Sequence, residues 1–594
     1  MSPLPRLLVA VLLVAGTAGL VPGDAHADDV ATLVRDFDAY FRAADPVRAA
    51  QGGDGAAARQ WPDNSPPAVA RRRATLEAFD ARLRRLADAP LAAEDALNRE
   101  LLAARVGTAL EALGFDEERM PFISGDGFYT VPDYAALNTV LRDEEAAEAW
   151  IARLEALPAY YARETENMRR GLRTGFAQPR ATVERAIADV RGQYLMAPAQ
   201  SPLLAPFATL PATLTEATRR ALVERGRAAF ERRVRPAQLA LLQFLEREYL
   251  PRARPGLGIG TVPDGREYYA HLAHRFTTTS MTPEQIHALG LAEVRRIRQR
   301  MDEVIASTGF RGTFAEFLRH VRTDPKFYVD AERYGERASE IAKRADFLLP
   351  RYFGAMPRLP YGVRPMPAGL ENSANGYLPG SPRQGVAGMV VYKPWIAPQT
   401  PVFGLPAWVL HEGVPGHHLQ IALSQELPDL PDFRRADDIT AYVEGWALYA
   451  EALGEEMGIY RDPYEQFGRL SLEIWRACRL AIDTGLHVMG WTREQAVACL
   501  RFFNDTATTE IEFEVDRYVA WPGQALAYKV GERKIHELRA RAATALGMRF
   551  DLRAFHDLVL GAGPLPLAVL ERRVDAWIAA STAARAGPRT RAEP

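Results

Sequence analysis

Apolar residues recur at three- and four-residue steps along most of this chain, the spacing typical of helices with one buried face. The pattern is clear over residues 67–86, 144–173 and 179–194, where Arg and Glu fill the polar positions. A capping box over residues 282–285, with proline in the first helical position, predicts a further helix start. The helical spacing returns from Trp408 onward. We therefore predict a mainly α fold.

The pattern changes between Leu359 and Pro406, where Gly, Pro, Asn and Tyr dominate and helical spacing is lost. A short run rich in β-branched residues, Gly388–Tyr392, lies in this stretch. Such runs between turn-forming residues favour strands. We predict a small antiparallel sheet or hairpin here, next to the helix that carries the candidate chemistry.

A chain of 594 residues is too long for one simple core, so we expect two or more subdomains. Proline clusters near residues 197–211 and 251–263 predict loops or linkers. The interpretation is an N-terminal helical region (28–250), a helical linker region (251–370) and a metal-binding catalytic region (371–594). We expect these regions to fold together as one intertwined unit.

The first 27 residues are typical of a secretory signal peptide. One cation, Arg6, precedes an apolar stretch from Leu7 to Leu20, and Ala25-His26-Ala27 is a small-x-small cleavage site. We predict cleavage after Ala27 and a secreted or periplasmic protein. The alternative is an uncleaved anchor helix, but the stretch is short for a span of about 20 residues. No Cys follows it, and no later stretch is apolar enough for stable membrane insertion.

The net charge and the number of cysteines limit which classes of function the sequence supports. A net charge of −2 gives no electrostatic basis for binding nucleic acid, so we expect no nucleic-acid partner. The chain has two cysteines, Cys478 and Cys499, both within helical patterns. An exported protein can hold them as a disulfide or as two buried thiols, and the sequence leaves both open.

Candidate metal chemistry is concentrated in the run His-Glu-Gly-Val-Pro-Gly-His-His, residues 411–418. In the common zinc-hydrolase motif, two His at i and i+4 share one helical face, and the Glu after the first His is the general base. Here the later histidines stand at i+6 and i+7. On a regular helix His417 lies roughly 240° around from His411, and His418 lies about 10 Å along the axis. Neither pair can then share one ion.

The residues between the histidines remove this difficulty. Pro415 has no N–H to donate to the carbonyl of His411, so the helical hydrogen bond fails inside the motif. Gly413 and Gly416 tolerate backbone angles that other residues resist. We therefore predict that the helix is interrupted between Glu412 and the second histidine.

Absorbing two extra residues in this break gives His417 the place of the i+4 ligand. His418 would need three absorbed residues, so we favour His417 as the second metal ligand beside His411. His418 is then predicted to support the site or to face the substrate. The competing interpretation is a His-rich surface loop, which the apolar run directly before it, Leu405–Leu410, disfavours.

A third ligand is expected from residues 439–453, which read as a helix with two acids, Glu444 and Glu451. They are seven positions apart and so lie on one face. Glu444 is the predicted third ligand, and Glu451 is predicted to orient an imidazole. The neighbours are apolar, and a carboxylate without a partner would be costly there. The alternative for either residue is an ordinary solvated acid.

These motifs resemble the bacterial domain-of-unknown-function 885 (DUF885) family. The resemblance covers nearly the whole mature chain, including the helix around Gly290, and its most specific stretches are 411–420, 444–449, 483–487 and 521–529. The family resembles the gluzincin metallopeptidases, which are largely helical and bind zinc through two His and one Glu. The resemblance implies a zincin-like architecture and peptide hydrolysis. This chain departs from the gluzincin pattern in its histidine spacing and in Leu448, four residues after Glu444.

Other motif residues suggest supporting roles. Tyr528 is predicted to donate its hydroxyl to the oxyanion of a tetrahedral intermediate. Lys529 or Arg479 is predicted to bind a substrate carboxylate. Asp483 and His487, at i and i+4, are predicted to form a hydrogen-bonded pair that supports the site or protonates a leaving amine. Each has a structural alternative, as core residue or local hydrogen bond.

The sequence thus predicts a zinc-dependent hydrolase with one ion and Glu412 as general base, most simply a peptidase acting on short peptides. Another divalent metal suits the same ligands. One alternative keeps the metal but hydrolyses a non-peptide amide or an ester. The other is a secreted metal- or peptide-binding protein without turnover.

Overall fold

A computed structural model describes residues 22–366, 376–382, 385–428, 430–435, 439–503 and 508–583. The apolar part of the predicted signal peptide lies outside these residues. The predicted cleavage point, after Ala27, falls within the first helix, α1 (Pro22–Ala44). None of the described helices combines the length and apolarity that crossing a membrane requires.

Helices make up most of the described chain, which confirms the mainly α prediction. The N-terminal half contains α1, α2 (Pro46–Gln51), α3 (Pro66–Arg85), α4 (Ala93–Phe115), α5 (Val131–Leu137), α6 (Glu144–Thr174), α7 (Arg180–Leu195), α8 (Glu216–Ala229), α9 (Arg235–Phe244), α10 (Gly265–Thr277) and α11 (Pro283–Ser307). The capping box predicted at the start of α11 is present, with reciprocal hydrogen bonds between Thr282 and Gln285. Three helices, α3, α6 and α7, lie within one or two residues of their predicted bounds.

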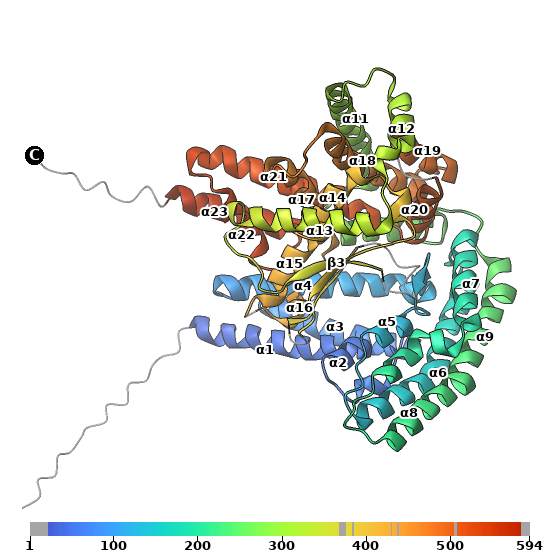
Figure 1. The fold of residues 1–594 in the computed structure, drawn as a ribbon. Helices are drawn as coiled ribbons and strands as arrows, with labels where there is room; N and C mark the ends of the chain where they lie inside the picture. The colour runs from blue at the N-terminus through green and yellow to red at the C-terminus, as the bar shows by residue number, and fades with distance from the viewer. Residues whose placement is uncertain are drawn as a thin grey trace, which may run out of the picture.

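The second half contains α12 (Phe314–Thr323), α13 (Ala331–Leu348), α14 (Leu405–Glu412), α15 (His417–Glu426), α16 (Asp432–Arg435), α17 (Thr440–Glu456), α18 (Pro463–Val488), α19 (Arg493–Phe503), α20 (Thr508–Ala520), α21 (Ala527–Leu546), α22 (Leu552–Leu560) and α23 (Leu567–Ala583). The candidate chemistry lies on α14, α15, α17, α18 and α21. Figure 1 shows α13 running across this half above the sheet strand β3.

A three-stranded sheet interrupts the helices, as the change of pattern predicts. Its strands are β3 (Tyr361–Pro365), β4 (Gly376–Leu378) and β5 (Gly388–Tyr392), in the order β3-β5-β4. The antiparallel prediction holds for β4 and β5 but is wrong for β3, which pairs parallel with β5. The chain between β3 and β5 is long enough to return in the same direction. A separate small hairpin joins β1 (Phe122–Ile123) to β2 (Asp126–Gly127).

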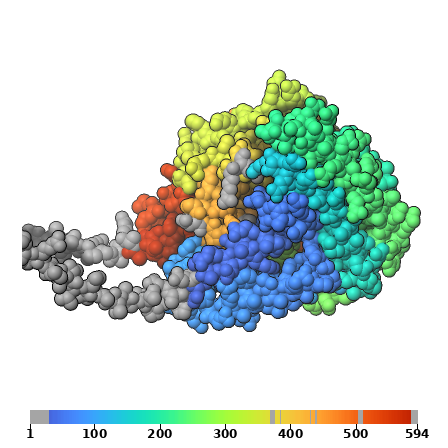
Figure 2. All heavy atoms as spheres, turned by 90° about the horizontal axis from the view of Figure 1, so that it is seen from below, coloured from blue at the N-terminus to red at the C-terminus, as the bar shows by residue number. Residues whose placement is uncertain are grey.

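The hydrophobic cores cross the region boundaries expected from the sequence. One core joins residues 30–106 to residues 334–574, so α1, α3 and α4 pack with the helices of the candidate site. A second core lies within residues 61–249 and holds α6 to α9 together. In Figure 1 these four helices curve around one side of the molecule. Figure 2 shows the N-terminal helices, in blue, covering one face beside them.

Two helix pairs approach unusually closely, and both involve glycine. Along α17 and α21, a Cβ at Gly531 would overlap the backbone of Ala441, and one at Gly445 would lie 2.5 Å from Gly531. Along α11 and α18, a Cβ at Gly290 would lie 2.7 Å from the Cβ of Leu480. The backbones of α17 and α21 therefore meet directly beside Glu444.

The two cysteines face each other between α18 and α19. Cys478 is buried, Cys499 is half-buried, and both are free thiols. Their sulfur atoms lie 2.7 Å apart. The two cysteines are therefore close neighbours whether they are present as thiols or as a disulfide, and only their oxidation state distinguishes the two alternatives.

Candidate metal centre

The helix bearing His411 and Glu412 is interrupted where the sequence predicts. The α14 helix ends at Glu412, with a last helical hydrogen bond from the N–H of Gly413 to the carbonyl of Val409 (2.8 Å). The N–H of Gly416 donates to Leu410 instead, at 2.9 Å, and α15 begins at His417. The peptide bond between Val414 and Pro415, inside the break, is cis. The predicted interruption is confirmed.

Gly416 makes this break compact. A Cβ on Gly416 would overlap the carbonyl oxygens of Leu410 and His411, so no larger residue fits without displacing the backbone. The indole Nε1 of Trp446, on α17, donates to the carbonyl of Pro415 at 2.8 Å. The connection is thus folded back against the end of α14 and held there from the next helix, which places the first residue of α15 beside His411.

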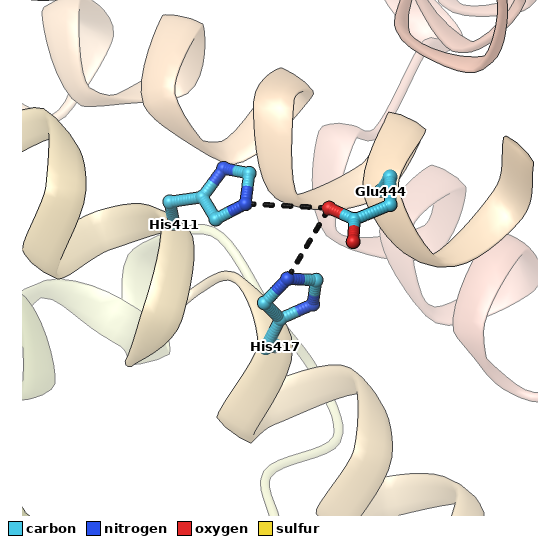
Figure 3. Close-up of side chains that lie close together, drawn as sticks. All are labelled: His411, His417 and Glu444. Atoms are coloured by element: carbon cyan, nitrogen blue, oxygen red, sulfur yellow. Dashed lines mark ion pairs between the residues drawn. The ribbon is translucent and has the colours of Figure 1, made fainter. Parts of the chain in front are cut away.

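His411, His417 and Glu444 converge from three helices (Figure 3). The Oε2 atom of Glu444 lies 3.4 Å from Nε2 of His411 and 3.4 Å from Nε2 of His417. Ligand atoms of the three residues all lie within 4.8 Å of one another. The two imidazole rings are nearly perpendicular, at 86°, so their nitrogens approach Glu444 from different directions.

The two 3.4 Å distances from Oε2 of Glu444 to the imidazole nitrogens suit a shared metal ion better than hydrogen bonds. Donors bound to one zinc ion at 2.0–2.1 Å in a tetrahedral arrangement lie about 3.4 Å from each other, whereas N–H···O hydrogen bonds are usually 2.7–3.2 Å long. Oε2 of Glu444 is buried and has no hydrogen-bond partner among the described residues. Two imidazoles and one carboxylate also form a donor set that zinc prefers. The residues present therefore fit a zinc ion.

Glu451 fixes the orientation of the first imidazole. Its Oε1 atom lies 2.8 Å from Nδ1 of His411, which directs Nε2 of that ring toward Glu444. Burial lowers the pKa of His411, but the carboxylates of Glu444 and Glu451 outweigh it and raise the value to about 9. Burial would raise the pKa of Glu444, but His417 and His411 hold it well below its usual range. The carboxylates thus favour a positive charge at this point.

Glu412 is buried beside the cluster but is not one of the three converging groups. Burial raises its pKa above the usual value, and the nearby imidazoles of His411 and His417 oppose that rise. Its carboxylate also faces the sheet, since a Cβ at Gly376 of β4 would lie 3.6 Å from its Oε2 atom. Glu412 therefore lies between the cluster and strand β4, with a pKa shifted in the direction that a general base needs.

The structure brings Tyr528 and Arg479 to this centre. Tyr528 lies one helical turn before Gly531, where α21 meets α17 next to Glu444. Burial raises the pKa of its phenol, and the negative charge of Glu444 adds to that rise. The guanidinium of Arg479, on α18, lies over the ring of Tyr528, 4.6 Å from its centroid. Both residues thus occupy positions compatible with their predicted roles.

Both ring nitrogens of His418 are occupied by protein groups, which argues against the predicted substrate-facing role and leaves the predicted alternative, a supporting role. Nδ1 of His418 lies 2.9 Å from the hydroxyl of Tyr377, and Nε2 lies 3.0 Å from the carbonyl of Leu359. The ring of Tyr361 lies against it, with centroids 4.4 Å apart. Through Tyr377 of β4, His418 therefore links α15 to the sheet.

Lys529 is also not free to bind a substrate carboxylate. Its ammonium is fully buried and contacts Glu473 at 2.7 Å, Glu532 at 2.8 Å and Glu293 at 3.5 Å. Three carboxylates already surround the cation. The sequence could not show this, because these partners come from α11 and α18 as well as from α21.

Asp483 and His487 share a helix face but do not bond to each other. Oδ1 of Asp483 accepts from the hydroxyl of Tyr269 (2.6 Å) and the N–H of Gly523 (2.9 Å). Nδ1 of His487 accepts from the N–H of Ile259 at 3.1 Å, and its Nε2 contacts the carbonyl of Tyr518 at 2.9 Å. The predicted pair is therefore wrong. Longer-range packing supplies partners that compete successfully with the i,i+4 contact.

The buried carboxyl of Asp483 leads to a pH-dependent prediction. Burial raises its pKa to about 7, despite the hydrogen bonds from Tyr269 and Gly523. The unfolded value is about 3.9, so the folded state loses stability as pH rises from about 4 to about 7 and then levels off. Asp483→Asn removes this loss. Urea unfolding should show the variant gaining about 2–4 kcal/mol on wild type between pH 5 and pH 8.

The control for that measurement is Asp302→Asn, at an exposed aspartate of α11. We expect its difference from wild type to be the same at both pH values. An equal free-energy difference at pH 5 and pH 8 for Asp483→Asn would contradict the assigned burial effect.

Several supporting residues escaped the sequence analysis. Trp446 donates a hydrogen bond to the carbonyl of Pro415 in the break. Arg476 lies 3.7 Å from Glu451. Arg517 contacts Gln524, whose side chain also contacts Tyr528. Trp446 could have been suspected, because it lies two positions after Glu444 in the motif. The arginines carry no such signal, because cations at helical spacing usually face solvent.

The chain is similar to a described protein family and to solved structures over most of its length. The sequence matches the family described as "Bacterial protein of unknown function (DUF885)" over residues 46–574. The crystal structure of the "putative lipoprotein from Colwellia psychrerythraea" has a TM-score of 0.87 at 28% identity, covering 94% of this chain and 100% of that one. A "putative lipoprotein of unknown function from Shewanella oneidensis" has a TM-score of 0.71 at 18% identity, covering 91% and 99%. No curated protein matches the sequence.

Proposed function

The chain belongs to the DUF885 family of bacterial proteins, and we propose that it is a zinc-dependent hydrolase that cleaves short peptides. The observation that carries this proposal is the convergence of His411, His417 and Glu444, each Nε2 lying 3.4 Å from the same carboxylate oxygen. Glu451 behind His411 and Glu412 beside the cluster supply the orienting and proton-accepting groups that such a site needs.

The roles of the residues follow from their positions. A zinc ion held by the three ligands would supply Lewis acidity toward a carbonyl and toward water. Glu412 accepts the proton of the attacking water and passes it to the leaving nitrogen. Tyr528, near Glu444, donates its hydroxyl to the oxyanion that develops on the carbonyl. Lys529 and His487 have no part, because other groups occupy their polar atoms.

Strand β4 favours a peptide over another amide or an ester. Among the described strands it lies at the edge of the sheet, and its Gly376 lies beside the carboxylate of Glu412. An extended peptide can add to a free strand edge through main-chain hydrogen bonds. A peptide bound along β4 would pass its backbone close to Glu412. An ester or small amide would gain little from this edge.

We also propose that the protein acts outside the cytoplasm. The similar structure from Colwellia psychrerythraea belongs to a protein described as a "putative lipoprotein", and the first residues of this chain have the pattern of a cleaved signal peptide.

Metal analysis of the purified mature protein tests the central point. We expect about one zinc per chain after dialysis against metal-free buffer, and loss of zinc in His411→Ala, because one of three ligands is removed. His320→Ala, on α12 and outside the cluster, is the control and should keep its zinc. Peptide hydrolysis should disappear with chelator and return with added zinc. Well under one equivalent of any transition metal in wild type would refute the proposal.

A further inference from the structure

One guanidinium nitrogen of Arg479, beside Tyr528, has no hydrogen-bond partner in the part of the chain that the structure describes. Its Nε donates to the hydroxyl of Tyr518 at 2.8 Å, and its Nη2 donates to Glu514 at 3.1 Å. Nη1 is buried and has no hydrogen-bond partner among the described residues, although Arg479 as a whole is only 8% exposed. A buried guanidinium nitrogen normally finds an acceptor.

The surrounding charges do not balance. Arg517 donates to both oxygens of Glu514, from Nε at 3.0 Å and from Nη2 at 2.9 Å, while Arg479 uses the same carboxylate. Two guanidiniums therefore share one carboxylate, and the group keeps one net positive charge. Such a charge in a buried place is costly unless an anion meets it.

This positive charge lies close to the candidate metal centre. On α18, Arg476 contacts Glu451, and Arg479 follows three residues later, one helical turn along the same face. The Arg479 guanidinium lies over the ring of Tyr528, which stands where α21 meets α17 beside Glu444. A substrate held at Glu444 would therefore place its neighbouring group near Tyr528 and Arg479.

We propose that Arg479, with Tyr528 beside it, binds the free α-carboxylate of a short peptide, so that cleavage takes place near the C-terminus. A terminal carboxylate carries one negative charge, which matches the excess charge of the arginine pair, and its planar oxygens suit a guanidinium. Lys529 cannot take this role, because three carboxylates already surround it. This inference rests on the proposed hydrolase function and names its substrate end.

The test compares two forms of the same peptide in the zinc-loaded enzyme. Ala-Ala-Ala with a free carboxylate should be hydrolysed with a kcat/KM about tenfold or more above that of its C-terminal amide, because hydrogen bonds to charged groups contribute about that factor. In Arg479→Gln the free-acid preference should fall close to one. Arg479→Lys, which keeps the charge but loses the planar donors, should give an intermediate preference and guards against misfolding of the first variant.

A binding measurement separates this inference from the proposed function. Titration of the free acid and the amide into chelator-treated, dialysed wild type needs no turnover, and the free acid should bind more tightly by a similar factor. Equal binding and equal kcat/KM for acid and amide would overturn the Arg479 assignment while leaving the hydrolase intact. Absence of hydrolysis for both peptides with a preserved binding preference would instead refute the hydrolase and keep the carboxylate site.

Discussion

Replacing Glu412 by Gln is expected to lower peptide hydrolysis by about 10²- to 10⁴-fold, the usual contribution of a general base, with zinc still bound at one per chain. Glu412 is buried next to His411 and His417 but is not among the converging ligand atoms. Gln has nearly the same shape and cannot accept the proton. The measurement pairs kcat/KM on a peptide substrate with zinc content of the same preparation.

Two comparisons make this result specific. Glu284→Gln, at an exposed glutamate in the first turn of α11, makes the same chemical change away from the centre and should leave both quantities unchanged. Loss of zinc together with activity would show that Glu412 holds the metal. Retention of wild-type activity with bound zinc would show that another group accepts the proton.

Replacing Gly416 by Ala is expected to destabilise the protein by about 3 kcal/mol or more, or to displace α15 and lose zinc. The added Cβ would overlap the carbonyl oxygens of Leu410 and His411, which are backbone atoms and cannot rotate away. In the first case the break keeps its shape and the strain lowers the stability of the fold. In the second case the break opens, His417 moves away from Glu444, and zinc is lost. Thermal unfolding and zinc content, measured together, distinguish these two outcomes.

Gly404→Ala is the matched control, because Gly404 precedes α14 and a Cβ there would contact nothing within 4 Å. We expect it to keep both the wild-type melting temperature and one zinc per chain. A Gly416→Ala protein that behaves like the Gly404 variant would mean that the break is held by contacts other than the close approach of its backbone.

Local sequence chemistry predicted the most distinctive part of this site. Pro415 cannot donate to the carbonyl of His411, so the helix had to break there, and the size of the break selected His417 over His418. The seven-residue spacing of Glu444 and Glu451 put both acids on one face, and both contact the ring of His411. These conclusions needed only helix geometry and the absence of one N–H.

The predictions that were wrong depended on contacts between distant segments. Asp483 and His487 have the right spacing to pair, but Tyr269 and Ile259, more than two hundred positions earlier, occupy their polar atoms. Lys529 is surrounded by acids that include Glu293 of α11. Periodicity reveals which face of a helix is buried but not which helix covers it. The parallel pairing of β3 with β5 could not be predicted either, because the sequence pattern does not show which strands are neighbours.

The ring of His411 contacts Glu444 with one nitrogen and Glu451 with the other. Two residues of α17, two helical turns apart, therefore contact the same imidazole. An insertion or deletion of one residue between these acids would rotate one of them by about 100° away from the ring. The seven-residue spacing on α17 therefore sets the positions of both carboxylates relative to the His411 ring. Relatives that keep this centre can vary widely in loop length and composition, but the seven-residue count between the two acids should remain constant.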